Sequence, residues 1–343
     1  MKHLNQYITE YIIKKKLAKP IDSEYKYHPI NKEELIENIK ECFNNDDYDL
    51  NCINTRNIKD MSNLFDVSIY DPIINNKTNN IDISNWNVSK VTNMKLMFNG
   101  FENFNCDLSK WDVSKVEDMN GMFSCCKNFE GKGLENWDVS NVKDMCGIFY
   151  FCENFNCDLS NWDVSKVENM GHTFNSCEKF KGDGLENWNI VNVTDMNSMF
   201  KGCYKFTGKS IENWNVRNIK YINEMFSYCY SLDADFSKWN IYKANNLSKM
   251  FQYCKKFTGK GLENWNVSKV KNMSNMFENC EKFTGKSIEN WNVAKVTNMT
   301  LMFYKCNKLD CDLSNWDVSK VKDMIMIFDD CKSLTNKPSW YKE

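Results

Sequence analysis

The sequence predicts a repeat solenoid of the α/β leucine-rich-repeat-like class, and three observations support that prediction. Tryptophan recurs at intervals of 24 to 26 residues over most of the 343-residue chain. Ten of these tryptophans have a phenylalanine twelve positions later. The twelve-residue stretch KFTGKSIENWNV occurs twice, beginning at Lys205 and at Lys282. The recurring tryptophans are Trp86, Trp111, Trp137, Trp162, Trp188, Trp214, Trp239, Trp265, Trp291, Trp316 and Trp340.

Positions within a repeat are numbered here from its tryptophan, which is position 0. Apolar residues follow at +2, +5 and +8, then phenylalanine at +12 and phenylalanine or leucine at +18. An earlier, degenerate unit has Ile53 in the tryptophan place and Phe65 at +12, and the loop 69–80 lengthens it. We therefore expect about eleven coils and a terminal half-turn.

Each coil has its own local pattern. The piece L-S-x-W-D-V, as in residues 108–113, alternates apolar and polar side chains and predicts a short strand. Asn or Asp at +7, such as Asp118, is a typical N-cap, and the M-x-x-M-F-x-x-C segment after it predicts a short helical turn. One such unit cannot bury a face alone, whereas stacked units can.

Glycine marks the turns of the longer repeats. Repeats of 26 residues carry a glycine before the tryptophan, which predicts a turn with positive φ. Two of these turns read Gly-Lys-Ser, but a phosphate-binding loop needs another glycine five positions earlier, where Cys203 and Cys280 stand. We expect a turn there, and no nucleotide or other cofactor. The glycines are Gly131, Gly182, Gly208, Gly259 and Gly285.

Composition narrows the functional class. The net charge is −2, and Arg56 and Arg217 are the only arginines, so we expect no nucleic-acid partner. The mean hydropathy is −0.61, and no apolar run approaches the roughly 20 residues that span a bilayer. The N-terminus lacks the continuous apolar core of a secretory signal. These features predict an intracellular monomer without a transmembrane segment.

Residues 1–49 are expected to form a helical cap over the solenoid of residues 50–343. Asn31 and Glu34 form a capping-box-like start for a helix. An earlier basic amphipathic helix ends before Pro20, and either capping or membrane association would suit it. The apolar face of the first helix is Leu4, Tyr7, Ile8, Tyr11 and Ile12, and that of the second is Leu35, Ile36, Ile39 and Phe43.

The order of these motifs closely resembles the BspA-like leucine-rich repeat surface proteins. The resemblance rests on the W-D-V-S-x-V-x-x-M core at 111–119, 137–145, 162–170 and 316–324, and on the lead-in at 50–65. It implies a right-handed solenoid that serves protein binding or adhesion. Members of that family occur in bacteria and in large DNA viruses, where the chains are rich in Lys and Asn and lack a secretory signal. If this chain is a viral member, the resemblance implies a location in the host cytoplasm or the virion.

Cysteine and histidine offer little chemistry. Nine of the sixteen cysteines stand at +15, from Cys126 to Cys331, and we expect a buried column of free thiols. Local disulfides or a metal are the alternatives, but no Cys-x-x-Cys pair exists, so no metal site is expected. The three histidines and the evenly repeated Asp and Glu residues give no candidate catalytic group.

The repeat pattern loosens between residues 204 and 253, where tyrosines gather. Two pairs share positions +14 and +16, so each pair should lie on adjacent coils, and tyrosine is favoured at binding hot spots. We predict a protein-contact patch there; neutral drift, or binding through the lysines at +4, is the alternative. The overall expectation is a non-enzymatic interaction or adhesion scaffold, or else a structural component of a virion or other particle. The candidate residues are Tyr204, Tyr221, Tyr228, Tyr230, Tyr242 and Tyr253.

Overall fold

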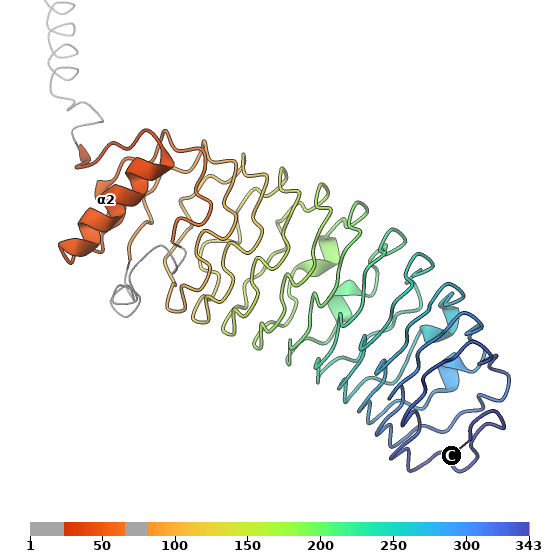
Figure 1. Cartoon of the computed structure of the whole chain (residues 1–343). Helices are drawn as coiled ribbons and strands as arrows, with labels where there is room; N and C mark the ends of the chain where they lie inside the picture. Colours follow the sequence, from red (N-terminus) through yellow and green to blue (C-terminus); the bar gives the residue numbers. More distant parts are fainter. Residues whose placement is uncertain (1–23, 66–80, 343) are drawn as a thin grey trace, which may run out of the picture.

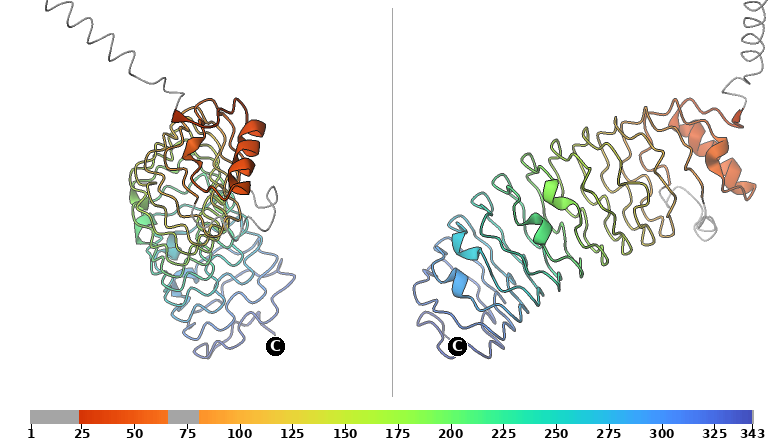
Figure 2. Two further views of the ribbon diagram at one scale, coloured as in Figure 1. Left: turned by 90° about the vertical axis from the view of Figure 1, so that its left-hand side faces the viewer. Right: turned by 180° about the vertical axis from the view of Figure 1, so that it is seen from behind.

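The computed structural model describes residues 24–65 and 81–342. It is a curved stack of coils that runs from α2 at one end to the C-terminus at the other (Figures 1 and 2). The described residues contain one α-helix and five short 3-10 helices, and no named β-strand. None of these helices is long and apolar enough to cross a membrane. The elements are α2 (Lys32–Asn44), η2 (Leu50–Cys52), η3 (Leu185–Asn187), η4 (Lys209–Ile211), η5 (Leu262–Asn264) and η6 (Lys286–Ile288).

The solenoid is confirmed, but the expected strand and helical turn of each coil are wrong. Turns dominate the segment from +8 to +15: the N–H of Met122 bonds the carbonyl of Met119 at 3.1 Å, and that of Cys126 bonds Phe123 at 3.0 Å. Residues at +10 and +14 have positive φ, as at Leu96 (53°) and Cys125 (61°). A left-handed residue every fourth position prevents consecutive helical turns.

A strip of hydrogen bonds from +7 to +14 joins each coil to the next. With one exception, at Ile222, the N–H groups at +8, +10, +12 and +14 donate to the carbonyls at +7, +9, +11 and +13 of the following coil. For example, Phe123 N bonds Ile148 O at 2.9 Å, and Cys125 N bonds Tyr150 O at 2.6 Å. These axial bonds satisfy the buried backbone without strands.

The apolar columns point inward, as predicted. All ten +12 phenylalanines are buried, with 3% exposure at most, and consecutive rings stack, such as Phe123 on Phe149 at 5.9 Å. Neighbouring tryptophans also stack, with the planes of Trp111 and Trp137 only 3° apart. Stacked aromatic rings therefore form the centre of the array.

Two side-chain columns also hydrogen-bond along the axis. The indole Nε1 of Trp137 donates to the carbonyl oxygen of Leu108, one coil earlier, at 3.2 Å. The Cys152 thiol donates to the carbonyl oxygen of Phe123 at 3.0 Å. All sixteen cysteines are unpaired, and eight of the nine at +15 are buried, which agrees with the expected column of free thiols. Each bond gives a buried carbonyl a second donor.

The +7 side chains act in turns rather than as helix caps. The Oδ1 of Asp118 accepts the N–H of Asn120 at 2.9 Å, which is an Asx turn. The +1 position does the same, as where Asp112 accepts the N–H of Ser114 at 3.1 Å. The prediction of a polar acceptor was right, and the helix assigned to it was wrong.

The helix α2 confirms the second of the two predicted N-terminal helices. Asn31 Oδ1 accepts the N–H of Glu34 at 2.8 Å, and the Glu34 carboxylate accepts the N–H of Ile30 at 3.0 Å. Leu35, Ile39 and Phe43 are buried, but Ile36 is only half-buried, and Cys42 takes the fourth inward place. The first predicted helix and the loop 69–80 lie outside the described residues.

The glycine turns confirm their predicted conformation. Gly208 has φ 80° and Gly285 has φ 82°, and each precedes a three-residue 3-10 helix, η4 or η6, that contains the Lys-Ser pair. The Gly-Lys-Ser triplet is therefore a turn between stacked coils. The pairs η3 and η4, and η5 and η6, lie side by side on adjacent coils (Figure 1).

Candidate interaction surface

Four of the six predicted tyrosines meet on one part of the surface. Tyr228 stacks on Tyr253 with ring centroids 4.6 Å apart, and Tyr204 stacks on Tyr230 at 4.9 Å. Tyr228 and Tyr230 join the two pairs edge to face at 6.3 Å. The repeat thus places both pairs on adjacent coils, as predicted. We call these four half-buried residues the tyrosine cluster.

Two of these tyrosines occupy positions that do not suit a bulky residue. Tyr228 and Tyr253 stand at +14 with φ of 63° and 61°; two coils have glycine there, Gly100 and Gly202, and the others have further non-glycine residues such as Phe151. A non-glycine residue in the left-handed region costs about 1–2 kcal/mol. The tyrosines are therefore not placed there by backbone preference.

The hydrogen-bond strip lacks one bond beside the cluster. Among the described coils from Trp86 to Trp291, each +8 N–H bonds the next +7 carbonyl except Ile222, which has no such bond to Asn246. Tyr221 stands at +7 and supplies no Asx acceptor, so the N–H of Asn223 donates to Asn197 Oδ1 of the preceding coil at 3.2 Å. The coil that carries Tyr228 and Tyr230 is thus less tightly joined to the next one.

A buried polar chain runs beneath the tyrosines. Ser227 Oγ donates to Gln252 Oε1 at 3.1 Å, and Gln252 Nε2 donates to Glu278 Oε2 at 2.7 Å. All three residues stand at +13, next to the tyrosine column, and are at most 9% exposed. Asn275 Nδ2 also donates to Glu278 at 2.7 Å. Buried hydrogen bonds of this kind fix the backbone on which the rings sit.

Charged side chains and protonated tyrosine hydroxyls at and around the tyrosine cluster can form polar contacts with a partner. Glu224 stands at +10, within the strip from +7 to +14. Its carboxylate contacts Lys201 Nζ at 2.7 Å and Lys249 Nζ at 3.8 Å. Burial raises the pKa of the Tyr204 hydroxyl, and burial together with the Glu278 carboxylate raises the pKa of Tyr253. Both hydroxyls therefore stay protonated near neutral pH and can donate hydrogen bonds.

The structure does not bring Tyr221 and Tyr242 into the cluster. Tyr221 is 53% exposed and stands at +7, at the opposite border of the strip from Tyr228. Tyr242 stands at +3 between two lysines, with Lys269 Nζ 5.1 Å and Lys243 Nζ 5.8 Å from its ring centroid. The predicted patch is therefore one cluster of four residues and two separate tyrosines.

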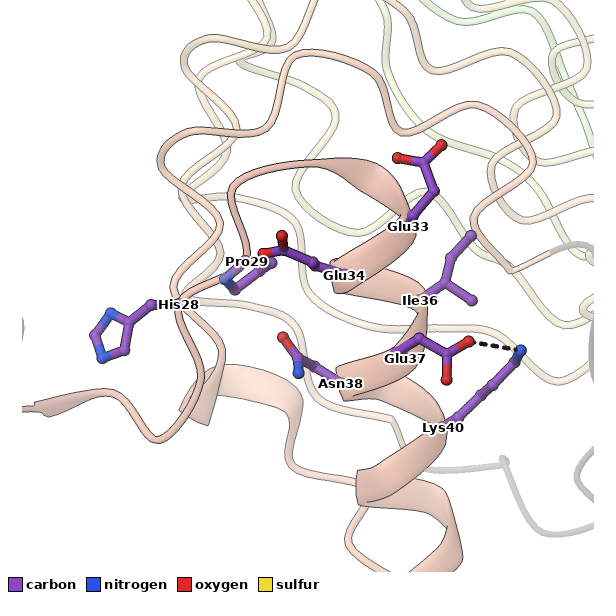
Figure 3. A pocket seen from close by; sticks show the side chains of 8 residues that line it. All are labelled: His28, Pro29, Glu33, Glu34, Ile36, Glu37, Asn38 and Lys40. Carbon is purple, nitrogen blue, oxygen red and sulfur yellow. Dashed lines mark hydrogen bonds and ion pairs between the residues drawn. The ribbon is translucent and has the colours of Figure 1, made fainter.

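A hollow of about 600 Å³ lies on the outer face of α2 (Figure 3). Glu33, Glu34 and Glu37 line it together with half-buried Ile36. Glu34 is engaged at the helix start, and Glu37 pairs with Lys40 at 3.1 Å. Two of its three carboxylates are thus already bound within α2, which makes this hollow a weaker candidate than the tyrosine cluster.

Tandem coils with a continuous aromatic core define a repeat solenoid protein. The chain belongs to the family described as "Mycoplasma protein of unknown function, DUF285", whose pattern matches residues 33–132, 67–188, 172–284 and 256–342. The repeat family that the resemblance indicated is thereby supported, and no match bears on a viral origin. No curated protein matches the chain.

One solved structure with some similarity is the functional domain of InlJ from Listeria monocytogenes, described as including a cysteine ladder. The match is 10% identical, covers 79% of this chain and 60% of that chain, and has a TM-score of 0.23. The chain thus spans about 60% of that neighbour's length. A likeness at this level carries no argument about fold or function.

Proposed function

We propose that the protein is a non-catalytic protein-binding scaffold whose contact surface is centred on the tyrosine cluster. The observation that supports this proposal is the pair of tyrosine stacks, joined by the Tyr228–Tyr230 contact. Tyrosines with few rotamers, half exposed and held by neighbouring rings, lose little side-chain entropy when a partner covers them. The four rings cross three consecutive coils, so a partner would bind along the axis.

Repetition itself favours a scaffold over an enzyme. A solenoid offers an extended surface on which the same polar groups recur, whereas catalysis needs convergent groups that differ from their surroundings. Around the tyrosine cluster the unusual groups are aromatic rings and the Lys201–Glu224–Lys249 set, which give area and charge complementarity.

The test is affinity capture from the native source with the wild-type chain and with the triple variant Tyr228→Ser, Tyr230→Ser and Tyr253→Ser. The matched control is Phe151→Ser, because Phe151 is also at +14, has φ 57° and is 38% exposed, but lies outside the cluster. We expect a protein that the wild type and the control retain and the triple variant loses. If every captured protein survives the triple change, the cluster is not the contact surface.

A further inference from the structure

Two thiols and a carboxylate meet where the cap joins the first coil. Cys42 lies near the end of α2, Cys52 is the last residue of η2, and Asp47 lies in the segment between them. One ligand atom from each lies within 4.8 Å of the other two, and the two Sγ atoms are 3.9 Å apart. Within residues 24–65 and 81–342, no other three Cys, His, Asp or Glu residues converge this closely.

Backbone hydrogen bonds hold the three residues in place. The N–H of Asp47 donates to the carbonyl of Cys42 at 3.0 Å, which folds the segment back onto the helix end. The N–H groups of Lys26 and Tyr27 donate to the carbonyl of Cys52 at 2.8 and 3.3 Å. The ligand atoms thus come from separate backbone segments that are fixed without any ion, so little ordering is left for binding.

The sulfur separation matches a shared metal better than a disulfide. Two thiolates at about 2.3 Å from a tetrahedral zinc ion lie about 3.8 Å apart, close to the observed 3.9 Å. A disulfide would need the sulfurs to close to about 2.05 Å. A zinc-bound carboxylate oxygen lies about 3.5 Å from each thiolate sulfur. The Asp47 oxygen is within 4.8 Å of both sulfurs, so it would have to approach each by up to about 1.3 Å to complete three ligands.

Carboxylates beside the site add negative charge that attracts a cation. Asp49 as well as Asp47 lies near the Cys52 thiol, and Lys26 is the opposing positive charge. A divalent cation bound between the sulfurs would thus be close to two acidic groups and one basic group. Cys42 is buried, whereas Asp47 is exposed, so a metal ion can reach the site from solvent on the Asp47 side.

We propose that Cys42, Cys52 and Asp47 bind one thiophilic divalent cation of the zinc class, with water in the remaining position. Binding forms two metal–sulfur bonds and one metal–oxygen bond, and the two thiol protons pass to solvent, so affinity rises with pH. The ion would join the end of α2 to the start of the solenoid. This site is independent of the tyrosine cluster, which lies some 150 residues further along the chain. These two cysteines are ten positions apart, outside the Cys-x-x-Cys spacing by which a metal site is recognised in a sequence.

The test is titration of the reduced, metal-free full-length chain with Co²⁺, followed by competition with Zn²⁺. We expect one saturable equivalent with a thiolate-to-cobalt absorption band, and a rise in the unfolding temperature when Zn²⁺ is present. Cys52→Ser should lose the band and bind Zn²⁺ at least about tenfold more weakly, and Asp47→Asn should weaken binding by a smaller factor. The control is Cys157→Ser, because Cys157 is also half-buried beside an aspartate but has no second thiol nearby.

Two results would overturn the site. The first is a cobalt titration of Cys52→Ser that is indistinguishable from that of the wild type, with circular dichroism showing both chains folded. The second is a wild-type chain that binds no metal but gains a Cys42–Cys52 disulfide, seen by peptide mass, after dilute hydrogen peroxide. That second result would make the pair a redox site instead. Cys42→Ala, which leaves the half-exposed Cys52 in place, repeats the comparison if Cys52→Ser is unstable.

Discussion

The thiol of Cys254 donates to the carbonyl oxygen of Phe226, one coil earlier, over 3.0 Å. The same oxygen also accepts the backbone N–H of Cys229 at 2.9 Å, so both of its lone pairs are used inside the core. A cysteine at +15 is therefore both a small apolar residue and a hydrogen-bond donor, and this explains its recurrence without disulfides.

Cys254→Ala should lower the free energy of unfolding by about 1–3 kcal/mol, because it removes that donor and leaves a small cavity. Urea denaturation of the reduced chain measures the change. Cys157→Ala is the control: Cys157 is half-buried in a turn, and its loss should cost less than about 1 kcal/mol. Equal losses at both sites would mean that the +15 thiol bond contributes nothing.

Trp239→Phe should also destabilise the chain, by about 1–3 kcal/mol. The indole Nε1 of Trp239 donates to the Ile211 carbonyl oxygen at 3.1 Å, and this residue is only 1% exposed. Trp340→Phe is the comparison, because Trp340 makes the same kind of bond to Leu313 at 2.8 Å but is half-buried, where water can replace the donor. A larger loss at Trp340 would contradict this account of the indole column.

Gly261→Ala should cost about 2–4 kcal/mol, and Gly147→Ala only about 1 kcal/mol. Both glycines have positive φ, 87° and 60°. A Cβ at Gly261 would lie 2.1 Å from Ser237 N, whereas at Gly147 its nearest neighbour would be 3.6 Å away. The pair separates steric conflict between coils from backbone strain alone, and denaturation of both variants gives the difference. Similar losses would show that the coils can separate to admit a methyl group.

Tyr253→Gly should change the free energy of unfolding by less than about 1 kcal/mol. Relief of left-handed strain, about 1–2 kcal/mol, offsets the lost stacking on Tyr228, about 0.5–1.5 kcal/mol. Phe251→Ala in the same coil should cost about 3–5 kcal/mol, because Phe251 is fully buried. A large loss at Tyr253 would assign the tyrosine column a structural role and weaken the proposed contact surface.

Acid should weaken the turn at Asp235 only below about pH 4. The backbone N–H and then the side chain of Ser237, with Lys260 adding to them, lower the pKa of Asp235 to about 2. Because the folded-state pKa lies below the unfolded one, this carboxylate stabilises the fold at higher pH, and its contribution is lost as pH falls toward 2. A carboxyl-carbon NMR titration should show its midpoint well below that of an ordinary aspartate. A midpoint near 4 would contradict the turn geometry.

The inward columns could be predicted because the repeat fixes which positions face the core. The Phe123 and Cys126 columns, for instance, follow from an apolar spacing that recurs in every coil. The turns between +8 and +15 could not be predicted, because non-glycine residues such as Leu96 and Tyr228 fill the left-handed positions +10 and +14. Without a recurring glycine, the spacing of three and four between apolar residues looks the same as that of a helix.

The candidate sites also have features that the sequence predicts and features that only the structure shows. That Tyr228 should lie beside Tyr253 follows from their shared position, and the stacked rings confirm it. The missing bond at Ile222 could not be predicted, because its backbone N–H carries no signature in the sequence. The Cys42–Cys52 pair was missed because a helix end and a coil start are brought together only by the packing of α2.

The strip from +7 to +14 also has an electrical consequence. Its four bonds per coil all point the same way, with each N–H directed toward the following coil, while the bonds at +6 and +17 oppose them, as at Glu117 and Asn128. Each peptide unit carries a dipole of about 3.5 D, so the excess of two aligned units per coil adds from coil to coil. The stack is therefore polar along its length, as a single long helix would be. Its positive pole lies toward the higher-numbered coils, so a partner that carries opposite charges at its two ends would bind along the axis in one preferred direction.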